Sequence, residues 1–276
     1  MTLKLIDTFS GIGGFSYAAE KLVGGFKTVA FVECEPYCQK VLKKHWPTVP
    51  IYDDIRTYKP EPYSASVVVG GFPCQDISTG GQGQGITKET RSGLFYELMR
   101  IIRLVRPKYV VLENVAAILN NGMGIVLGEL ASSGFDCSWC CIPASAVGAC
   151  HERDRFWLIA TNPEYARLSR TEKSRCDEQI SQTKTRKETT LESKRNSQPS
   201  FSESFSRIAG KWEPTPFMLN PNWKGYASKC SLCRTDDGVS DQLHRNSRIK
   251  ALGNSVVPQV AAIPLQKILK IENQHP

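Results

Sequence analysis

Short runs of β-branched and aliphatic residues alternate with helical stretches along the first 160 residues, and this alternation constrains the fold most. The runs are Leu3–Asp7, Thr28–Val32, Ser66–Val69 and Tyr109–Leu112, and helical patterns occupy residues 15–23, 36–44 and 94–105. Strands that are apolar throughout and separated by helices are typical of a mostly parallel sheet with helices on both faces. The sequence therefore predicts an α/β fold, with functional side chains where the strands end.

The composition fits one large domain, or one domain with a small attached module. Of the 276 residues, 41% are hydrophobic and 22% are charged, which is enough to bury a sizeable core. Lys and Arg outnumber Asp and Glu by 35 to 27, so the net charge of +8 permits a polyanionic partner.

Nothing in the sequence predicts membrane insertion or export. No run of 18 apolar residues exists, and Asp7 precedes any apolar region of signal-peptide length. We therefore expect a cytoplasmic protein. Because several of the ten cysteines lie inside apolar runs, we expect free, buried, reduced thiols.

Two stretches differ from this α/β pattern. Residues 80–85 are too rich in glycine for regular structure, and we expect 80–91 to be a mobile lid. Residues 163–212 hold 11 Lys or Arg and 7 Asp or Glu, with few aliphatic residues. Such a stretch is either solvated and partly disordered, or ordered by a partner.

The motif Asp7-x-Phe9-Ser10-Gly11-x-Gly13-Gly14 lies between the first strand and helix and brings backbone close to a ligand. It lacks the Gly-x-Gly-x-x-Gly spacing of dinucleotide-binding turns, so a simple strand–helix connection is an equal alternative. Glu33 ends the second strand, where a carboxylate can accept hydrogen bonds from ribose hydroxyls. A solvated acid at a helix start explains Glu33 equally well.

Cys74 and Glu113 are the strongest candidates for chemistry. Cys74 follows a buried strand and stands between Pro73 and Gln75, outside any apolar periodicity, which is typical of a nucleophile. Glu113 follows four apolar residues, so desolvation can raise its pKa and make it a proton donor.

Two arginines and a polar turn complete the set of candidates. Arg153 and Arg155 are two residues apart, a spacing that points both side chains the same way on a strand, although charge runs are more often solvated edges. Residues 252–258 predict a polar turn before a helix over 256–269.

Taken together, these blocks resemble the cytosine-C5 DNA methyltransferase family. The blocks are the Asp-x-Phe-x-Gly-x-Gly-Gly turn, Glu33, Asp54-Ile55, Gly-Phe-Pro-Cys-Gln, Glu-Asn-Val, Arg-x-Arg and the late Gly-Asn-Ser-Val, in the family's order. They span residues 7–155 and 248 to about 269. His151 stands where the family usually has Gln, and Ile77 where it usually has an aromatic residue, so packing around the target base is expected to differ.

The resemblance implies a Rossmann-like class I methyltransferase fold and the cofactor S-adenosylmethionine. It implies that Phe9 packs on the adenine, the backbone of Gly11 and Gly13 approaches the methionine part, and Glu33 holds the ribose. Asp54 and Ile55 would contact the adenine. The implied cofactor site is Phe9, Ser10, Gly11, Gly13, Gly14, Glu33, Cys34, Asp54, Ile55, Pro73, Asn254 and Ser255.

The resemblance also implies the chemistry. The target cytosine leaves the duplex, because its C6 is inaccessible in the stack. Cys74 adds to C6 as a covalent nucleophile, Glu113 donates to N3, and Arg155 with Arg153 holds O2. C5 then takes the methyl group, and loss of the C5 proton expels Cys74.

In this family a target-recognition region interrupts the catalytic domain. Residues 1–162 and 248–276 are the expected catalytic domain, and residues 163–247 are the expected recognition region, with residues 163 to about 207 mobile without DNA. Cys230 and Cys233 can form half a zinc site with Cys176 or His244, but structural zinc normally shows two ligand pairs. We therefore expect no metal.

We expect a monomer that acts on double-stranded DNA, with a cognate restriction enzyme as a possible partner. Two alternatives remain open at this stage. One is a tRNA cytosine-5 methyltransferase of the same family, which the short recognition region permits. The other is a non-catalytic, sequence-specific DNA-binding protein, against which the intact Cys74, Glu113 and Arg155 argue.

Overall fold

The computed structural model describes residues 2–73, 93–149, 151–165 and 242–274, and its strands form one seven-stranded sheet. The sheet order is β3-β2-β1-β4-β5-β7-β6. The strands are β1 (Leu3–Thr8), β2 (Phe26–Val32), β3 (Ile51–Tyr52), β4 (Val67–Gly70), β5 (Tyr109–Val115), β6 (Asp136–Ile142) and β7 (Arg155–Thr161). Strands β1 to β5 pair in parallel, and β7 runs antiparallel to both β5 and β6. The predicted mostly parallel α/β fold is confirmed.

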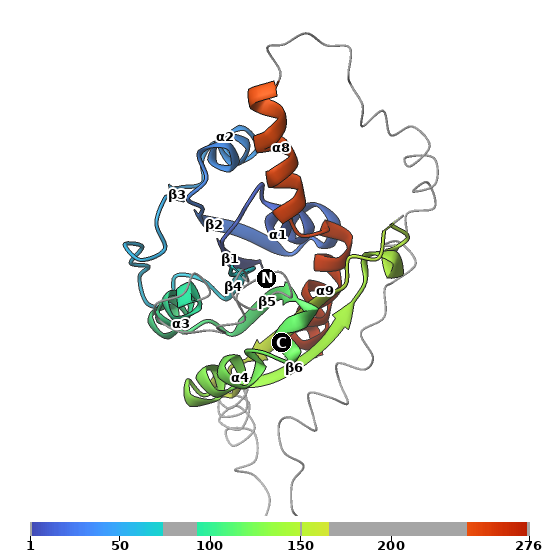
Figure 1. The fold of residues 1–276 in the computed structure, drawn as a ribbon. Coiled ribbons are helices and arrows are strands. Elements are labelled where there is room, and N and C mark those ends of the chain that lie inside the picture. The colour runs from blue at the N-terminus through green and yellow to red at the C-terminus, as the bar shows by residue number, and fades with distance from the viewer. Residues whose placement is uncertain (1, 74–92, 150, 166–241, 275–276) are drawn as a thin grey trace, which may run out of the picture.

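Helices cover both faces of this sheet (Figure 1). One face carries α1 (Gly14–Tyr17), the π-helix η1 (Ala18–Val23) that continues it, the 3₁₀-helix η4 (Ala144–Val147) and α9 (Pro258–Gln274). The other carries α3 (Leu94–Val105), the 3₁₀-helix η3 (Ala116–Leu119) and α4 (Met123–Ser132). Because both faces are covered, Val67, Val68 and Val69 of the central strand β4 are fully buried, which explains their unbroken apolar run.

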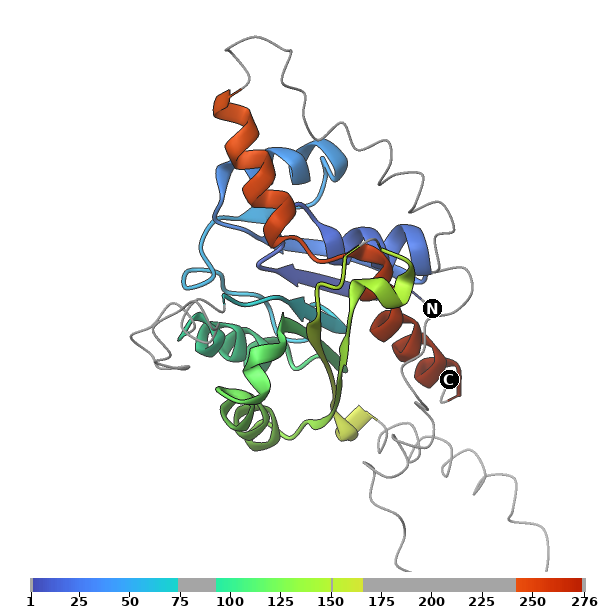
Figure 2. The same cartoon turned by 45° about the vertical axis from the view of Figure 1, so that its right-hand side comes forward.

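Segments from the two ends of the chain meet in the fold. Helix α9 packs against α1 and η1, and α8 (Gln242–Asn254) lies against α2 (Pro36–His45), as both views show (Figure 2). Lys250 of α8 forms an ion pair of 3.0 Å with Glu35, the residue before α2. The last block of the sequence is therefore placed directly over the first glycine turn.

Two predicted boundaries were wrong. Strand β5 does not stop at Leu112 but continues to Val115, because β7 pairs with it as far as Val115 and Arg155. The predicted polar turn 252–258 is helical as far as Asn254, and α9 begins at Pro258. Helix α8 packs against α2, and its own sequence has little amphipathic pattern.

The cysteine prediction was partly wrong. The described cysteines 34, 38, 137, 140 and 141 are free, and Cys38 is buried. Cys34 and Cys141 are instead exposed. Cys141 belongs to β6, the last strand in the sheet order, where Trp139 is also exposed.

Several predictions lie outside the described residues. These are Cys74, the expected lid at 80–91, and most of 163–247, including Cys230 and Cys233. In the part of the chain that the structure describes, no helix is long and apolar enough to cross a membrane. The same residues contain no group of three or more metal-ligating side chains.

Candidate active site

The glycine turn after β1 is held by a buried carboxylate. Oδ2 of Asp7 accepts hydrogen bonds from the backbone N–H of Ser16, at 3.2 Å, and from its hydroxyl, at 2.7 Å. Burial raises the pKa of Asp7 to about 7. Gly11 and Gly13 have φ of +54° and +86°, a left-handed region that favours glycine. The turn is therefore fixed between strand and helix, with its backbone free of Cβ atoms at these two positions.

Glu33 closes over this turn from the end of β2. Its Oε2 accepts from the backbone N–H of Gly11 at 2.7 Å, and its Oε1 accepts from that of Glu35 at 2.8 Å. A carboxylate oxygen has two lone pairs, so both oxygens can still accept from a ligand. The structure therefore brings the predicted Gly11 and Glu33 together. The neighbouring residue Cys34 is exposed to solvent. Burial of part of its side chain, together with the nearby charge of Glu33, raises the pKa of its thiol.

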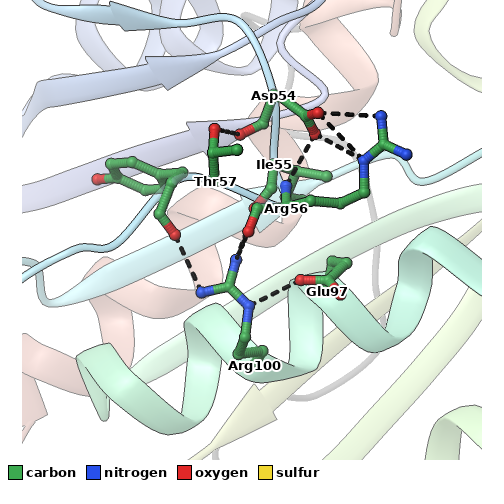
Figure 3. A network of polar contacts seen from close by, with 7 residues as sticks. Asp54, Ile55, Arg56, Thr57, Glu97 and Arg100 are labelled. Atoms are coloured by element: carbon green, nitrogen blue, oxygen red, sulfur yellow. Dashed lines mark hydrogen bonds and ion pairs between the residues drawn. The ribbon is translucent and has the colours of Figure 1, made fainter.

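The loop after β3 contributes an apolar side chain and a charged one. Ile55 is 5% exposed and packs in the same hydrophobic cluster as Phe9. Asp54 forms an ion pair of 2.9 Å with the exposed Arg56 (Figure 3), and hydrogen bonds from Arg56 hold the pKa of Asp54 below its usual range. Phe9 and Ile55 thus pack in one hydrophobic cluster, and Asp54 is the residue directly before Ile55.

Glu113 lies near the end of β5 and pairs with Arg155, the first residue of β7. The two side chains meet at 3.1 Å between Oε1 and Nε, and that of Glu113 is only 12% exposed. Burial raises the pKa of Glu113 to about 7, although the charges of Arg155 and Arg153 oppose this rise. A carboxyl group with this pKa can carry a proton near neutral pH.

The backbone that leads to Cys74 passes directly beside Glu113. A Cβ on Gly71 would lie 2.9 Å from Oε2 of Glu113, so glycine at this position lets the chain approach the carboxyl group. The next residue, Phe72, is buried against Phe95 of α3, with 5.0 Å between ring centres. Pro73, partly buried, follows as the last described residue before Cys74.

Asn114 supports this approach, a role that the motif alone did not reveal. It is 2% exposed, and its Nδ2 donates to the carbonyl of Phe72 at 3.2 Å. Its Oδ1 accepts from the backbone N–H of Val115 at 2.8 Å. The sequence signal is a polar residue at the end of a mostly buried strand.

The spacing predicted that Arg153 and Arg155 lie on one strand, and this was wrong for Arg153. Strand β7 begins only at Arg155, and Arg153 has a φ of +43°. Its Nη2 donates to the carbonyls of Gly253 at 2.7 Å and Ser255 at 2.9 Å. Arg153 therefore fastens the late Gly-Asn-Ser block to the site, with Asn254 exposed at the end of α8.

Gly14 makes a second junction with the late block. A Cβ on Gly14 would lie 2.6 Å from Cγ2 of Val256 and 3.0 Å from its carbonyl oxygen. The backbone of α1 and the chain after α8 can approach this closely only because residue 14 has no side chain. The first and last motifs of the sequence are thus in direct contact.

A small cavity lies behind Glu113. Trp157 is opposite Glu113 in the β5–β7 register, and its Nε1 has no hydrogen-bond partner among the described residues. The mainly apolar wall explains why Glu113 is desolvated. The lining consists of Glu113, Ile142, Ala144, Arg153, Arg155, Trp157, Val257 and Val260.

The sequence matches one family model over most of its length. Residues 3–231 match the C-5 cytosine-specific DNA methylase family. The chain belongs to this family. Gly11, Glu33 and Glu113, which the resemblance assigns to cofactor and catalysis, lie after β1, after β2 and near the carboxyl end of β5.

Two curated relatives illustrate the similarity. The chain is 30% identical over 168 residues to the Type II methyltransferase M.CviJI of Paramecium bursaria Chlorella virus IL3A, covering 60% of this chain and 45% of that one. It is 34% identical over 167 residues to the Type II methyltransferase M2.BsuMI of Bacillus subtilis strain 168, covering 58% and 42%. The matched region thus spans less than half of either relative.

A solved structure extends the likeness to the whole fold. The S. pombe Dnmt2 methyltransferase superposes with a TM-score of 0.59, covering 99% of this chain and 100% of that one. Its sequence identity is 12%, so this likeness shows the class I methyltransferase fold alone.

Proposed function

We propose that this protein transfers a methyl group from S-adenosylmethionine to C5 of a flipped cytosine in duplex DNA. The observation that carries the proposal is Glu113, a buried carboxyl group with a pKa of about 7, paired with Arg155 and adjoining the backbone that leads to Cys74. Membership of the cytosine methylase family supports it.

The residues at the ends of β1 and β2 fit S-adenosylmethionine. Phe9 and Ile55 offer apolar surface for the adenine, and Glu33 keeps lone pairs for the ribose hydroxyls. Gly11 leaves backbone accessible to the methionine part, which the late residues Asn254 and Ser255 would enclose, whereas Gly13 lets the turn pack against Trp46. When bound, the cofactor supplies an electrophilic methyl group.

The residues near β4, β5 and β7 would act on the base. Cys74 forms a bond to C6, which makes C5 nucleophilic, while Glu113 gives its proton to N3 so that negative charge does not accumulate there. Arg155 contacts Glu113 through Nε and the carbonyl of Asp154 through Nη1. In the described part of the chain its Nη2 has no such contact and can bind O2. Once C5 carries the methyl group, loss of the C5 proton expels Cys74 as a thiolate, and N3 returns its proton to Glu113.

Covalent trapping tests the proposal. Duplex DNA with 5-fluorocytosine at the target should form a stable adduct in the presence of cofactor, because fluorine does not leave as a proton does. Cys74→Ala should abolish both the adduct and methyl transfer. Cys141→Ala is the matched control, since Cys141 is an exposed thiol on the edge strand β6 and should leave both intact. Comparable transfer by Cys74→Ala would disprove the mechanism.

The same assay separates the alternatives. Labelled cofactor offered with duplex DNA and with transfer RNA distinguishes the two substrates, and we expect transfer to DNA. Transfer to RNA alone would favour the RNA branch of the family. Specific DNA binding without any transfer would favour a non-catalytic protein.

We assign the choice of DNA sequence to residues 163–247. The residues proposed for chemistry lie outside this segment, whereas its basic residues suit phosphate contacts, so DNA affinity should fall steeply with salt. Exchanging the segment for that of a relative with another specificity should move methylation to the relative's sites, as read by bisulfite sequencing. Methylation that stays at the original sites would place recognition in the catalytic domain.

A further inference from the structure

An arginine outside the motifs holds the loop that carries Asp54 and Ile55. Nη2 of Arg100, on α3, donates to the carbonyl of Ile55 at 2.6 Å, and its Nη1 donates to that of Tyr58 at 3.0 Å (Figure 3). A longer contact of 3.4 Å reaches the carbonyl of Arg56. One guanidinium group thus contacts three backbone carbonyls of the loop.

The loop has little regular structure of its own. Strand β3 contains only Ile51 and Tyr52, and the turn after it is closed by the N–H groups of Thr57 and Tyr58, which both donate to the carbonyl of Asp54. These bonds shape the turn but do not connect it to the rest of the fold. Its connection runs through the buried side chains of Ile55 and Tyr58, and through Arg100.

Arg100 is itself held by an ion pair and by the helix that carries it. Its Nε donates to Oε2 of Glu97, one turn earlier on α3, at 2.7 Å. The helix beneath is anchored by Phe95 and Met99, both fully buried. The planar fork of an arginine can serve two carbonyls and a carboxylate at once, whereas a lysine ammonium is a single charged point. The orientation of the guanidinium is therefore set before any ligand arrives.

We propose that Arg100 is a positioning residue for cofactor binding. It holds the turn 54–58 so that Asp54 and Ile55 face the adenine, although no motif includes it and it acts through the loop backbone. This inference rests on the proposed function, because it assumes that S-adenosylmethionine binds beside Phe9 and Ile55. Glu113 and Arg155 belong to β5 and β7, so Arg100 governs cofactor affinity and not the chemical step.

The matched control lies one turn further along the same helix. Arg103 also pairs with a carboxylate, Glu129, and donates to the hydroxyl of Ser133 at 3.0 Å, but it joins α3 to α4 and not to the loop. We would measure the Kd of S-adenosylmethionine and of S-adenosylhomocysteine by calorimetry on the full chain. The KM for cofactor and kcat would come from methyl transfer to DNA.

Arg100→Ala should raise both Kd values and the cofactor KM about tenfold, the equivalent of one lost charge-assisted bond. The value of kcat at saturating cofactor should stay within about twofold, and Arg103→Ala should bind cofactor like the wild type. Arg100→Lys and Glu97→Gln should give intermediate affinities, which keeps the test valid if Arg100→Ala folds poorly.

Two outcomes would overturn the inference. One is wild-type cofactor affinity in both Arg100→Ala and Arg100→Lys. The other is an equal loss in Arg103→Ala, which would trace the effect to the stability of α3. Failure of the wild-type chain to bind cofactor at all would instead reject the proposed function.

Discussion

Glu33 and Glu113 lie at the same edge of the sheet, in the halves that we propose for cofactor binding and for the reaction, and their surroundings differ. Glu33, beyond β2, accepts two backbone N–H groups within its own loops. Glu113, in β5, lies against an apolar cavity with an arginine beside it, and burial raises its pKa to about 7. The same residue type thus accepts hydrogen bonds where backbone donors surround it, and can carry a proton near neutral pH where water is excluded.

The contacts of the two proposed halves also reach different distances along the chain. In the proposed cofactor half, Glu33 meets Gly11 about one strand and helix earlier, although Arg100 reaches Ile55, 45 residues upstream. Arg153, of the proposed reaction half, meets Gly253, which is 100 residues away and next to Asn254 of the proposed cofactor site. Only the complete fold can bring such distant partners together.

Exchange of each carboxylate for an amide should give the largest effects, one on the rate and the other on cofactor affinity. Glu113→Gln should lower kcat by about 10²–10⁴, because the amide fills the space but cannot transfer a proton, while cofactor Kd stays nearly constant. Glu33→Gln should weaken cofactor binding, because its amide nitrogen cannot accept from a backbone N–H. Calorimetry and single-turnover rates on both variants check the split, and a large loss of cofactor affinity in Glu113→Gln would contradict it.

The pH dependence of kcat should report on the protonation of Glu113 in the proposed reaction half. Since the proposed donor is protonated Glu113 with a pKa of about 7, kcat should fall as pH rises above about 7. Arg155→Gln removes a charge that lowers this pKa, so the alkaline limb should move to higher pH. In Glu113→Gln the limb should disappear from the residual rate. An unchanged limb in that variant would assign the titration to another group.

The raised pKa values of Glu113 and Asp7 should also make the free energy of unfolding depend on pH. Both carboxyl groups have a higher pKa folded than unfolded, so the folded state holds extra protons between about pH 4 and pH 7. The stabilisation is complete below the unfolded pKa values and is lost as pH rises through about 7. Urea unfolding across this range measures it, and Glu113→Gln should reduce the slope.

Glycine substitutions should give the smallest effects. Gly14→Ala should destabilise the fold by roughly 1–3 kcal/mol, because its Cβ would overlap Val256 and force the late block away. Gly128→Ala is the control: the site lies in α4 with nothing within 4 Å of a Cβ, so alanine should stabilise by up to about 1 kcal/mol. Thermal unfolding of both variants provides the comparison, and equal stability changes would mean that the Gly14 junction is loose.

Much of the fold was determined by local sequence. The apolar runs and the helical pattern at 94–105 predicted β1, β2, β4 and α3 within a residue or two, because buried parallel strands leave a continuous apolar signal. The family resemblance placed Gly11 and Glu33 in one cofactor site, and the structure brings the two into contact, since both follow adjacent strands of one βαβ unit.

Other features were decided only by tertiary structure. Strand β5 extends to Val115, where β7 pairs with it, and α8 packs against α2, which lies about 200 residues earlier in the chain. Arg153 contacts the carbonyls of Gly253 and Ser255, 100 and 102 residues away, and Arg100 holds a loop more than 40 residues upstream. Local sequence determines which residues can form strands, turns and charges, but partners that distant in the chain are selected by the packing of the sheet and its helices.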